Sequence, residues 1–173
     1  LIGPTGQVSI GIIFGLVLVI VVFIIFGRGF SSGQFITQTA TGSAQTQKKE
    51  STQVAIKDLV IQAKIADEPK EHQAGLADYS SLSLGEGMFF VFDKNASYIF
   101  WMKNVEFAID IIWIDEAKKI VDIAPNIPPE PDKGEKELTR YKPKSDAKYV
   151  LEINAGLSSL HNLQIGDQVA FEL

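Results

Sequence analysis

An uninterrupted apolar segment near the N-terminus constrains this chain more than any other feature. Of the seventeen residues 10–26, fifteen are Ile, Val, Leu or Phe, and the other two are Gly11 and Gly15. Each large apolar residue favours insertion into a bilayer by about 0.3–0.6 kcal/mol, so the segment gains roughly 5–9 kcal/mol. In the hydrocarbon core of a bilayer, an α-helix is the only structure in which one segment hydrogen-bonds all of its own backbone groups. We therefore predict a transmembrane helix over residues 8–27, which inserts into the lipid bilayer and makes this a single-pass membrane protein.

Two further expectations concern this anchor. A cleaved signal peptide is the alternative, but its apolar core is normally shorter and a small-residue cleavage site follows it, whereas Arg28 and Phe30 follow here. Arg28 taken alone favours a cytoplasmic C-terminal domain, because positive charge marks the cytoplasmic side. Gly11 and Gly15 are four residues apart, a spacing that lets two helices approach closely and is compatible with a weak homodimer through this face. The alternative is that these glycines have no such role, because glycine is common in transmembrane helices.

The composition changes abruptly after the apolar segment. Residues 28–53 are rich in Ser, Thr, Gln and Gly and cannot bury enough surface to fold, so they predict a flexible tether. Residues 54–173 predict one globular domain. From residue 53 onward there are 13 Lys and Arg against 20 Asp and Glu, a net charge of −7, which excludes a nucleic-acid-binding surface. The chain has no cysteine, which excludes disulfides and thiolate metal sites.

The domain alternates short apolar runs with turn residues, a pattern typical of β-rich folds. Asp67 and Pro69 indicate a helix start, with Asp67 as the cap and Pro in the first turn. A Pro-rich, charged loop spans 125–148. The pattern predicts turns at 93–95 and 116–119, and helices at about 69–76 and 155–162. It predicts strands at 59–66, 88–92, 98–102, 110–115, 120–124, 149–154 and 168–173. These elements predict an α+β fold, a small, mainly antiparallel β barrel or curled sheet with two short helices.

Five ordered blocks within this domain form a recognisable signature. They are Gly75-Leu76, Gly87 to Phe92, Phe100 to Asn104, Asp110 to Asp115, and the set Tyr149 to Glu152, Asn154 to Gly156 and Ile165 to Asp167. With them the chain resembles the domain of unknown function 192 family, also called uncharacterised protein family 0127, over about residues 59–173. The resemblance implies a small β-rich fold that is often exported or membrane-attached. It implies no particular activity. On this ground we expect the globular domain to be extracytoplasmic.

The run from Trp101 to Asn104 places an aromatic ring, a cation and an amide at one strand end, which is typical of a ligand-binding rim. The alternative is that Trp101 and Met102 pack in the core while Asn104 forms a turn. Glu152 and two Asp residues supply carboxylates suited to acid–base chemistry. Their structural alternatives are backbone hydrogen bonds for Asp110, a hairpin turn for Asp115, and a Glu152–Lys103 ion pair. The candidate ligand-binding residues are Trp101, Lys103, Asn104, Asp110, Glu152 and Asn154.

The sequence also indicates what kind of function to expect. The two histidines, His72 and His161, lack zinc-ligand spacing, and no phosphate loop or nucleophile elbow occurs. We therefore expect no catalytic residue, no metal and no cofactor. The favoured function is a non-enzymatic binding or accessory module at the membrane surface, with an unknown protein or small-molecule ligand. One alternative is an unrecognised enzyme, such as a hydrolase of envelope material that uses carboxylates near Lys103. Another is a structural protein that dimerises through its helix.

Overall fold

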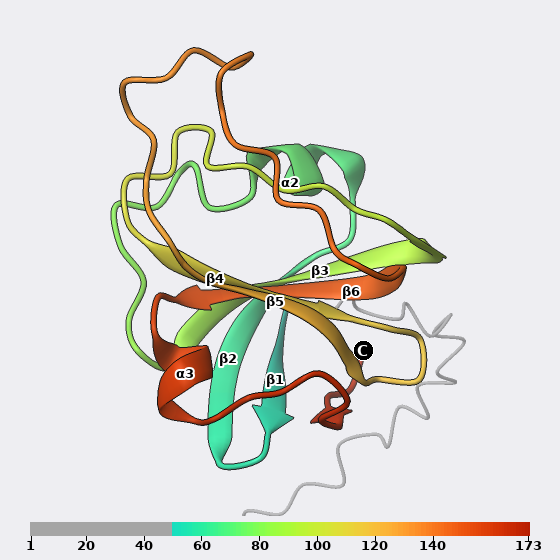
Figure 1. The fold of residues 1–173 in the computed structure, drawn as a ribbon. Coiled ribbons are helices and arrows are strands. Elements are labelled where there is room, and N and C mark those ends of the chain that lie inside the picture. Colours follow the sequence, from blue (N-terminus) through green and yellow to red (C-terminus); the bar gives the residue numbers. More distant parts are fainter. Residues whose placement is uncertain (1–49) are drawn as a thin grey trace, which may run out of the picture. The chain divides into compact units, whose positions relative to one another are not determined.

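The computed structural model describes residues 50–173, so the expected anchor and nearly all of the tether lie outside the described residues. Within residues 50–173, no helix is long and apolar enough to span a bilayer. The predicted α+β fold is confirmed for the globular part. It consists of one curled sheet and two short helices (Figure 1). Its elements are, in chain order, β1 Ser51–Ile56, β2 Leu59–Ala66, α2 Pro69–Ala74, β3 Glu86–Ala96, β4 Ile109–Ile114, β5 Ile120–Ile127, β6 Ala147–Asn154, α3 Leu157–Leu160 and β7 Val169–Ala170.

The sheet has the strand order β5-β4-β6-β3-β2-β1-β7. All its pairings are antiparallel except the one between β2 and β3, which run parallel. The two outermost strands approach each other, because an isolated bridge joins Lys119 to Gln168 and the Val169 N–H donates to the Lys118 carbonyl at 2.8 Å. The sheet therefore curls into a partly closed barrel, as the sequence predicts.

The two faces of the sheet carry separate apolar cores. The barrel core fills the inside of the curl and takes residues from all seven strands, among them Ile61, Phe89 and Leu151. The outer core, with Phe90, Trp113 and others, lies on the opposite face of β3, β4 and β6. Strand residues alternate between these faces because successive side chains point to opposite sides of a sheet. All of β4 is buried, which explains its almost unbroken apolar sequence.

Parallel pairing of β2 and β3 determines what covers the outer core. A parallel connection must cross over the sheet and cannot use a tight hairpin. Here the crossover holds α2, which lies above the sheet in Figure 1 together with the loops that precede β4 and β6. Helix α2 begins with Pro69, as expected, but the cap is Glu68 rather than Asp67. Glu68 forms a reciprocal capping box with Glu71.

Several predicted elements are wrong in detail. The strand expected at 98–102 is an irregular segment. It pairs with the loop before β6 through one isolated bridge, between Phe100 and Tyr141. The turn expected at 93–95 is absent, because β3 continues to Ala96 with an irregular register after Val91. The domain starts earlier than residue 54, since β1 begins at Ser51. The expected last strand is reduced to β7. The predicted 125–148 loop is shorter, because β5 extends to Ile127 and β6 begins at Ala147.

Candidate functional site

The structure brings three of the six predicted site residues to one cavity. Trp101, Lys103 and Glu152 line a hollow of about 150 Å³ on the outer-core side of the sheet. Residues 72–76, the end of α2 and the two residues after it, form one wall, and the segment 98–105 forms the other. Phe90, Phe92 and Glu152 come from β3 and β6. The site is thus assembled from elements far apart in the sequence.

The other three predicted residues lie elsewhere. Asn104 lines a neighbouring hollow and adopts a left-handed turn with φ of 58°, as the turn alternative predicted. The Asn154 amide donates to the carbonyls of Leu82 and Ser83 and so fixes the loop before β3. Asp110 points to the barrel-core face, away from the cavity, because its neighbours Ile109 and Ile111 face the outer core.

Asp110 is a structural residue in this fold. It is completely buried and accepts four hydrogen bonds. One oxygen takes the N–H groups of Asn126 and Gly156 at 2.7 and 2.9 Å, and the other takes the N–H and hydroxyl of Ser158 at 2.8 and 2.6 Å. These bonds tie β4 to β5 and to the start of α3, in agreement with the predicted alternative of backbone hydrogen bonds.

Glu152 is the unusual group of the cavity. Its position on β6 lies between Met88 of β3 and Ile111 of β4, so its strand neighbours are apolar. The residue is 5% exposed, and its Oε2 atom is buried with no hydrogen-bond partner. Burial raises the pKa of Glu152 to about 8, because a charged carboxylate loses its hydration there. At neutral pH this side chain is therefore a carboxylic acid with an O–H to donate.

The alternative role of Glu152, an ion pair with Lys103, is not found in the structure. Lys103 instead contacts Glu135 of the 128–146 segment, with 2.7 Å between Nζ and Oε2. This hydrogen bond holds the pKa of Glu135 below its usual range. The lysine and glutamate side chains are 43% and 59% exposed, so solvent screens the pair and it contributes little to stability. A ligand at the cavity mouth can compete for Lys103 at little expense.

The aromatic rings of the cavity are held by contacts with one another and with the backbone. The Phe92 ring contacts the rings of Tyr98 and His72, at centroid distances of 3.5 and 4.4 Å. His72 Nε2 lies 3.0 and 3.1 Å from the Ala66 and Val91 carbonyls, which only accept, so this nitrogen carries the hydrogen. The Trp113 indole donates to the Tyr98 carbonyl at 3.0 Å. Both walls are thereby fastened to the sheet.

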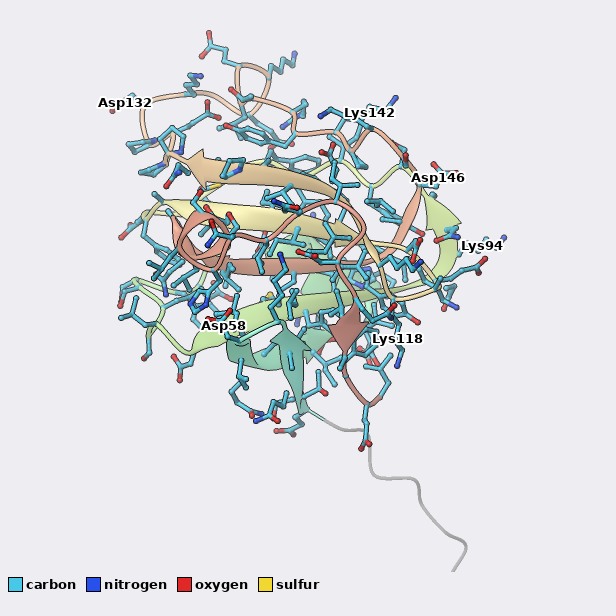
Figure 2. All side chains as sticks on the ribbon, turned by 60° about the horizontal axis from the view of Figure 1, so that its bottom comes forward. Asp58, Lys94, Lys118, Asp132, Lys142 and Asp146 are labelled. Atoms are coloured by element: carbon cyan, nitrogen blue, oxygen red, sulfur yellow. The ribbon has the colours of Figure 1, made fainter. Side chains whose placement is uncertain are left out.

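The 128–146 segment supports the second wall. Figure 2 shows Asp132, Lys142 and Asp146 spread along it. Glu130 fixes its start by accepting hydrogen bonds from Lys133 and from the backbone and hydroxyl of Thr139. These bonds, the one from Lys133 most of all, lower the pKa of Glu130 to about 2. At its end, the Arg140 guanidinium lies 4.3 Å above the Trp101 ring. Trp101 is 39% exposed rather than packed in the core, whereas Met102 is buried.

Sequence reasoning missed the helix side of this cavity. His72 reads as a polar surface residue of α2, and Phe90 and Phe92 read as part of a strand covered on both faces. Nothing in the local pattern signals that α2 crosses back over β3. The one signal of this cavity in the sequence is Glu152, a carboxyl residue within an otherwise apolar stretch of strand. Among residues 50–173, no three His, Asp or Glu side chains cluster to hold a metal ion.

Comparisons with known proteins place this geometry among its relatives. The model of the DUF192 family, described as "Uncharacterized ACR", matches residues 52–171. No curated protein matches the chain. A protein of unknown function from Novosphingobium aromaticivorans is 27% identical, with a TM-score of 0.61 over 69% of this chain and 83% of that one. A putative transcription regulator from Sinorhizobium meliloti is 23% identical, with a TM-score of 0.62 over 70% and 92%, and shows the fold alone.

Proposed function

The chain belongs to the DUF192 family, and from this premise we propose that it is a membrane-held, non-enzymatic module that binds a small molecule in the cavity beside Glu152. The family is uncharacterised and therefore contributes a fold rather than an activity. The proposal rests on the geometry of the cavity and on the apolar segment of the sequence. It concerns residues 50–173 for the binding site and residues 8–27 for the anchor.

The observation that carries the binding role is the unpartnered Oε2 atom of Glu152. Buried polar groups in folded proteins are nearly always hydrogen-bonded, and an exception needs a reason. Leaving such a group unpaired costs about 1–3 kcal/mol. Glu152 stabilises no other element through a hydrogen bond, yet it lines an open cavity with Lys103 and Trp101. A ligand that pairs with the carboxyl supplies the missing partner.

A second candidate function, an enzyme, is favoured by one observation. The pKa of about 8 places Glu152 close to the pH at which a general acid works best. Against it, Glu152 is the only carboxyl that lines this cavity among the described residues, because Asp110 faces the other side of the sheet. Glycoside hydrolysis normally needs two carboxyl groups flanking one bond. We therefore favour binding over hydrolysis.

The membrane attachment in this proposal is supported by the apolar segment 10–26 and the polar residues that follow it. A tether of about twenty-five residues reaches roughly 25–30 Å as a flexible coil. This length keeps a binding domain close to the bilayer surface. We further propose that the domain lies outside the cytoplasm. Association through Gly11 and Gly15 stays a prediction.

The test is a thermal-shift screen of small molecules against the full chain in phosphatidylcholine nanodiscs. Ala74 is exposed at the cavity wall, so Ala74→Trp blocks the cavity, and Ala117→Trp in the β4–β5 turn is the matched control. We expect stabilising compounds whose effect is lost in Ala74→Trp and kept in Ala117→Trp. If every stabilising compound acts equally on both variants, or none is found, the binding role is wrong. Turnover of a bound compound that Glu152→Gln abolishes would instead establish the enzyme.

A further inference from the structure

The cavity beside Glu152 has features that define the chemistry of its ligand, and this step rests on the proposed binding function. Its volume of about 150 Å³ sets the size. An engineered protein cavity of about 150 Å³ holds one benzene molecule. The apolar body of the ligand is therefore no larger than a single aromatic ring or a short branched chain. Anything bulkier extends through the mouth toward Lys103.

The aromatic rings exclude one obvious class of ligand, an organic cation held in an aromatic cage. Such a cage needs free ring faces, because a cation is attracted to the negative face of the ring. The Phe92 ring already contacts the rings of Tyr98 and His72, and Arg140 already lies over Trp101. Phe90 and Phe100 meet edge to face at 4.9 Å. Several ring faces are thus already in contact with other rings or with Arg140, which disfavours an organic cation held in an aromatic cage.

The charges around the cavity point the same way. The charged or titratable side chains that line it are His72 from α2, Tyr98 and Lys103 from the 98–105 segment, and Glu152 from β6. The Tyr98 hydroxyl donates to the Lys94 carbonyl, and burial raises the pKa of Tyr98, so this group stays neutral up to pH 9. The strands on either side of Glu152 contribute Met88 and Ile111, which carry no charge. The ammonium of Lys103 sits in an exposed ion pair that a ligand can displace. The cavity therefore offers a cation at its mouth and a carboxyl group deeper in.

We infer that this cavity binds a small monocarboxylate whose apolar body is about the size of one benzene ring. The ligand carboxylate accepts a hydrogen bond from the carboxyl O–H of Glu152 and receives its counter-charge from Lys103. A hydrogen bond from O–H to a carboxylate is charge-assisted and about twice as strong as a neutral one. The rings of the cavity surround the apolar body.

The proton on Glu152 determines in which direction the affinity for the ligand changes with pH. Benzoate is an anion throughout the neutral range, so it requires the protonated form of Glu152. Since Glu152 loses its proton near pH 8, benzoate should bind about tenfold more weakly at pH 9 than at pH 6. A cationic ligand requires the ionised form and shows the opposite trend.

The experiment is isothermal titration calorimetry on the full chain in phosphatidylcholine nanodiscs, with empty nanodiscs as the baseline. Three probes of matched size are compared: benzoate, benzylammonium and benzyl alcohol. We expect benzoate to bind most tightly and to weaken as the pH rises. Glu152→Gln retains a donor, so it should bind benzoate within a fewfold and without pH dependence. Glu152→Leu should abolish binding.

Lys103 is tested with a second pair of variants. Lys103→Gln should weaken benzoate binding about tenfold or more, and Lys119→Gln, in the β4–β5 turn, should leave it unchanged. Tighter binding of benzylammonium than of benzoate overturns the inferred class but leaves the binding function intact. Benzoate binding that Glu152→Leu and Lys103→Gln do not alter overturns the inferred site. If none of the probes binds, the carboxylate class is wrong, and the Ala74→Trp screen then decides separately whether the cavity binds anything.

Discussion

At the scale of single residues, two buried carboxyl groups on neighbouring strands have opposite roles. Asp110 accepts four hydrogen bonds on the barrel-core face, whereas Glu152 leaves an oxygen unpaired on the other. Removing the Asp110 carboxylate leaves three buried backbone N–H groups without a hydrogen-bond acceptor. We predict that Asp110→Ala lowers the free energy of unfolding by roughly 3 kcal/mol or more. Urea denaturation followed by tryptophan fluorescence measures it, with the exposed loop variant Asp132→Ala as control. A loss below about 1 kcal/mol contradicts the structural role.

For Glu152 we predict the reverse effect: removing its carboxyl group raises the free energy of unfolding, and the gain depends on pH. In the unfolded chain its carboxyl titrates near 4.5, and in the folded chain near 8. Between these values the unfolded chain has released a proton that the folded chain retains, so stability falls as the pH rises through this window and is level above it. Glu152→Gln removes this fall. We expect the variant to match the parent near pH 4 and to exceed it by a few kcal/mol near pH 9. A difference that does not change with pH would contradict a buried, unpaired carboxyl.

At the scale of elements, β2, β3 and β6 pack closely in the sheet that carries the cavity. A Cβ at Gly87 of β3 would lie 2.7 Å from the Glu152 carbonyl oxygen and 2.9 Å from Ile61 Cγ2. One of these strands must shift to admit it. We therefore predict that Gly87→Ala destabilises the domain by about 1–3 kcal/mol. Gly85 has open space around its Cβ position, so Gly85→Ala is the matched control and should be neutral in thermal unfolding. Equal melting temperatures for the two variants would refute this packing.

Element patterns were predictable where local sequence decides the structure. Strands β2, β4 and β6 follow from their apolar patterns, and helix α2 follows from Pro69. The segment 98–102 also alternates like a strand, but it forms a wall of the cavity. There Phe100 pairs with Tyr141 and Trp101 contacts Arg140, both from a distant loop that the local pattern does not indicate. The site was predictable only in part for the same reason. Trp101, Lys103 and Glu152 stand out by residue type, whereas His72 enters the cavity only because the parallel β2–β3 pair carries α2 over the sheet.

At the scale of the whole molecule, the proposal joins a binding domain to a membrane anchor. The chain has no cysteine, so a single introduced cysteine reports the topology without background. We predict that Ser43→Cys in the tether reacts with a membrane-impermeant maleimide on intact cells. Thr5→Cys, before the anchor, should react only after lysis. The reverse pattern would place the domain in the cytoplasm. Reaction of both on intact cells would exclude a single-pass anchor.

The proposed function depends on Glu152 being a neutral carboxyl group with no hydrogen-bond partner in the ligand-free protein. The most direct measurement is the titration of its side-chain carboxyl by NMR in the carboxyl-labelled full chain, with Glu152→Gln to assign the resonance. We predict a midpoint near pH 8 in the free protein. With benzoate at saturation the midpoint should move higher, because the ligand binds the protonated form. A midpoint near 4.5, or one that saturating benzoate leaves unchanged, would contradict the account.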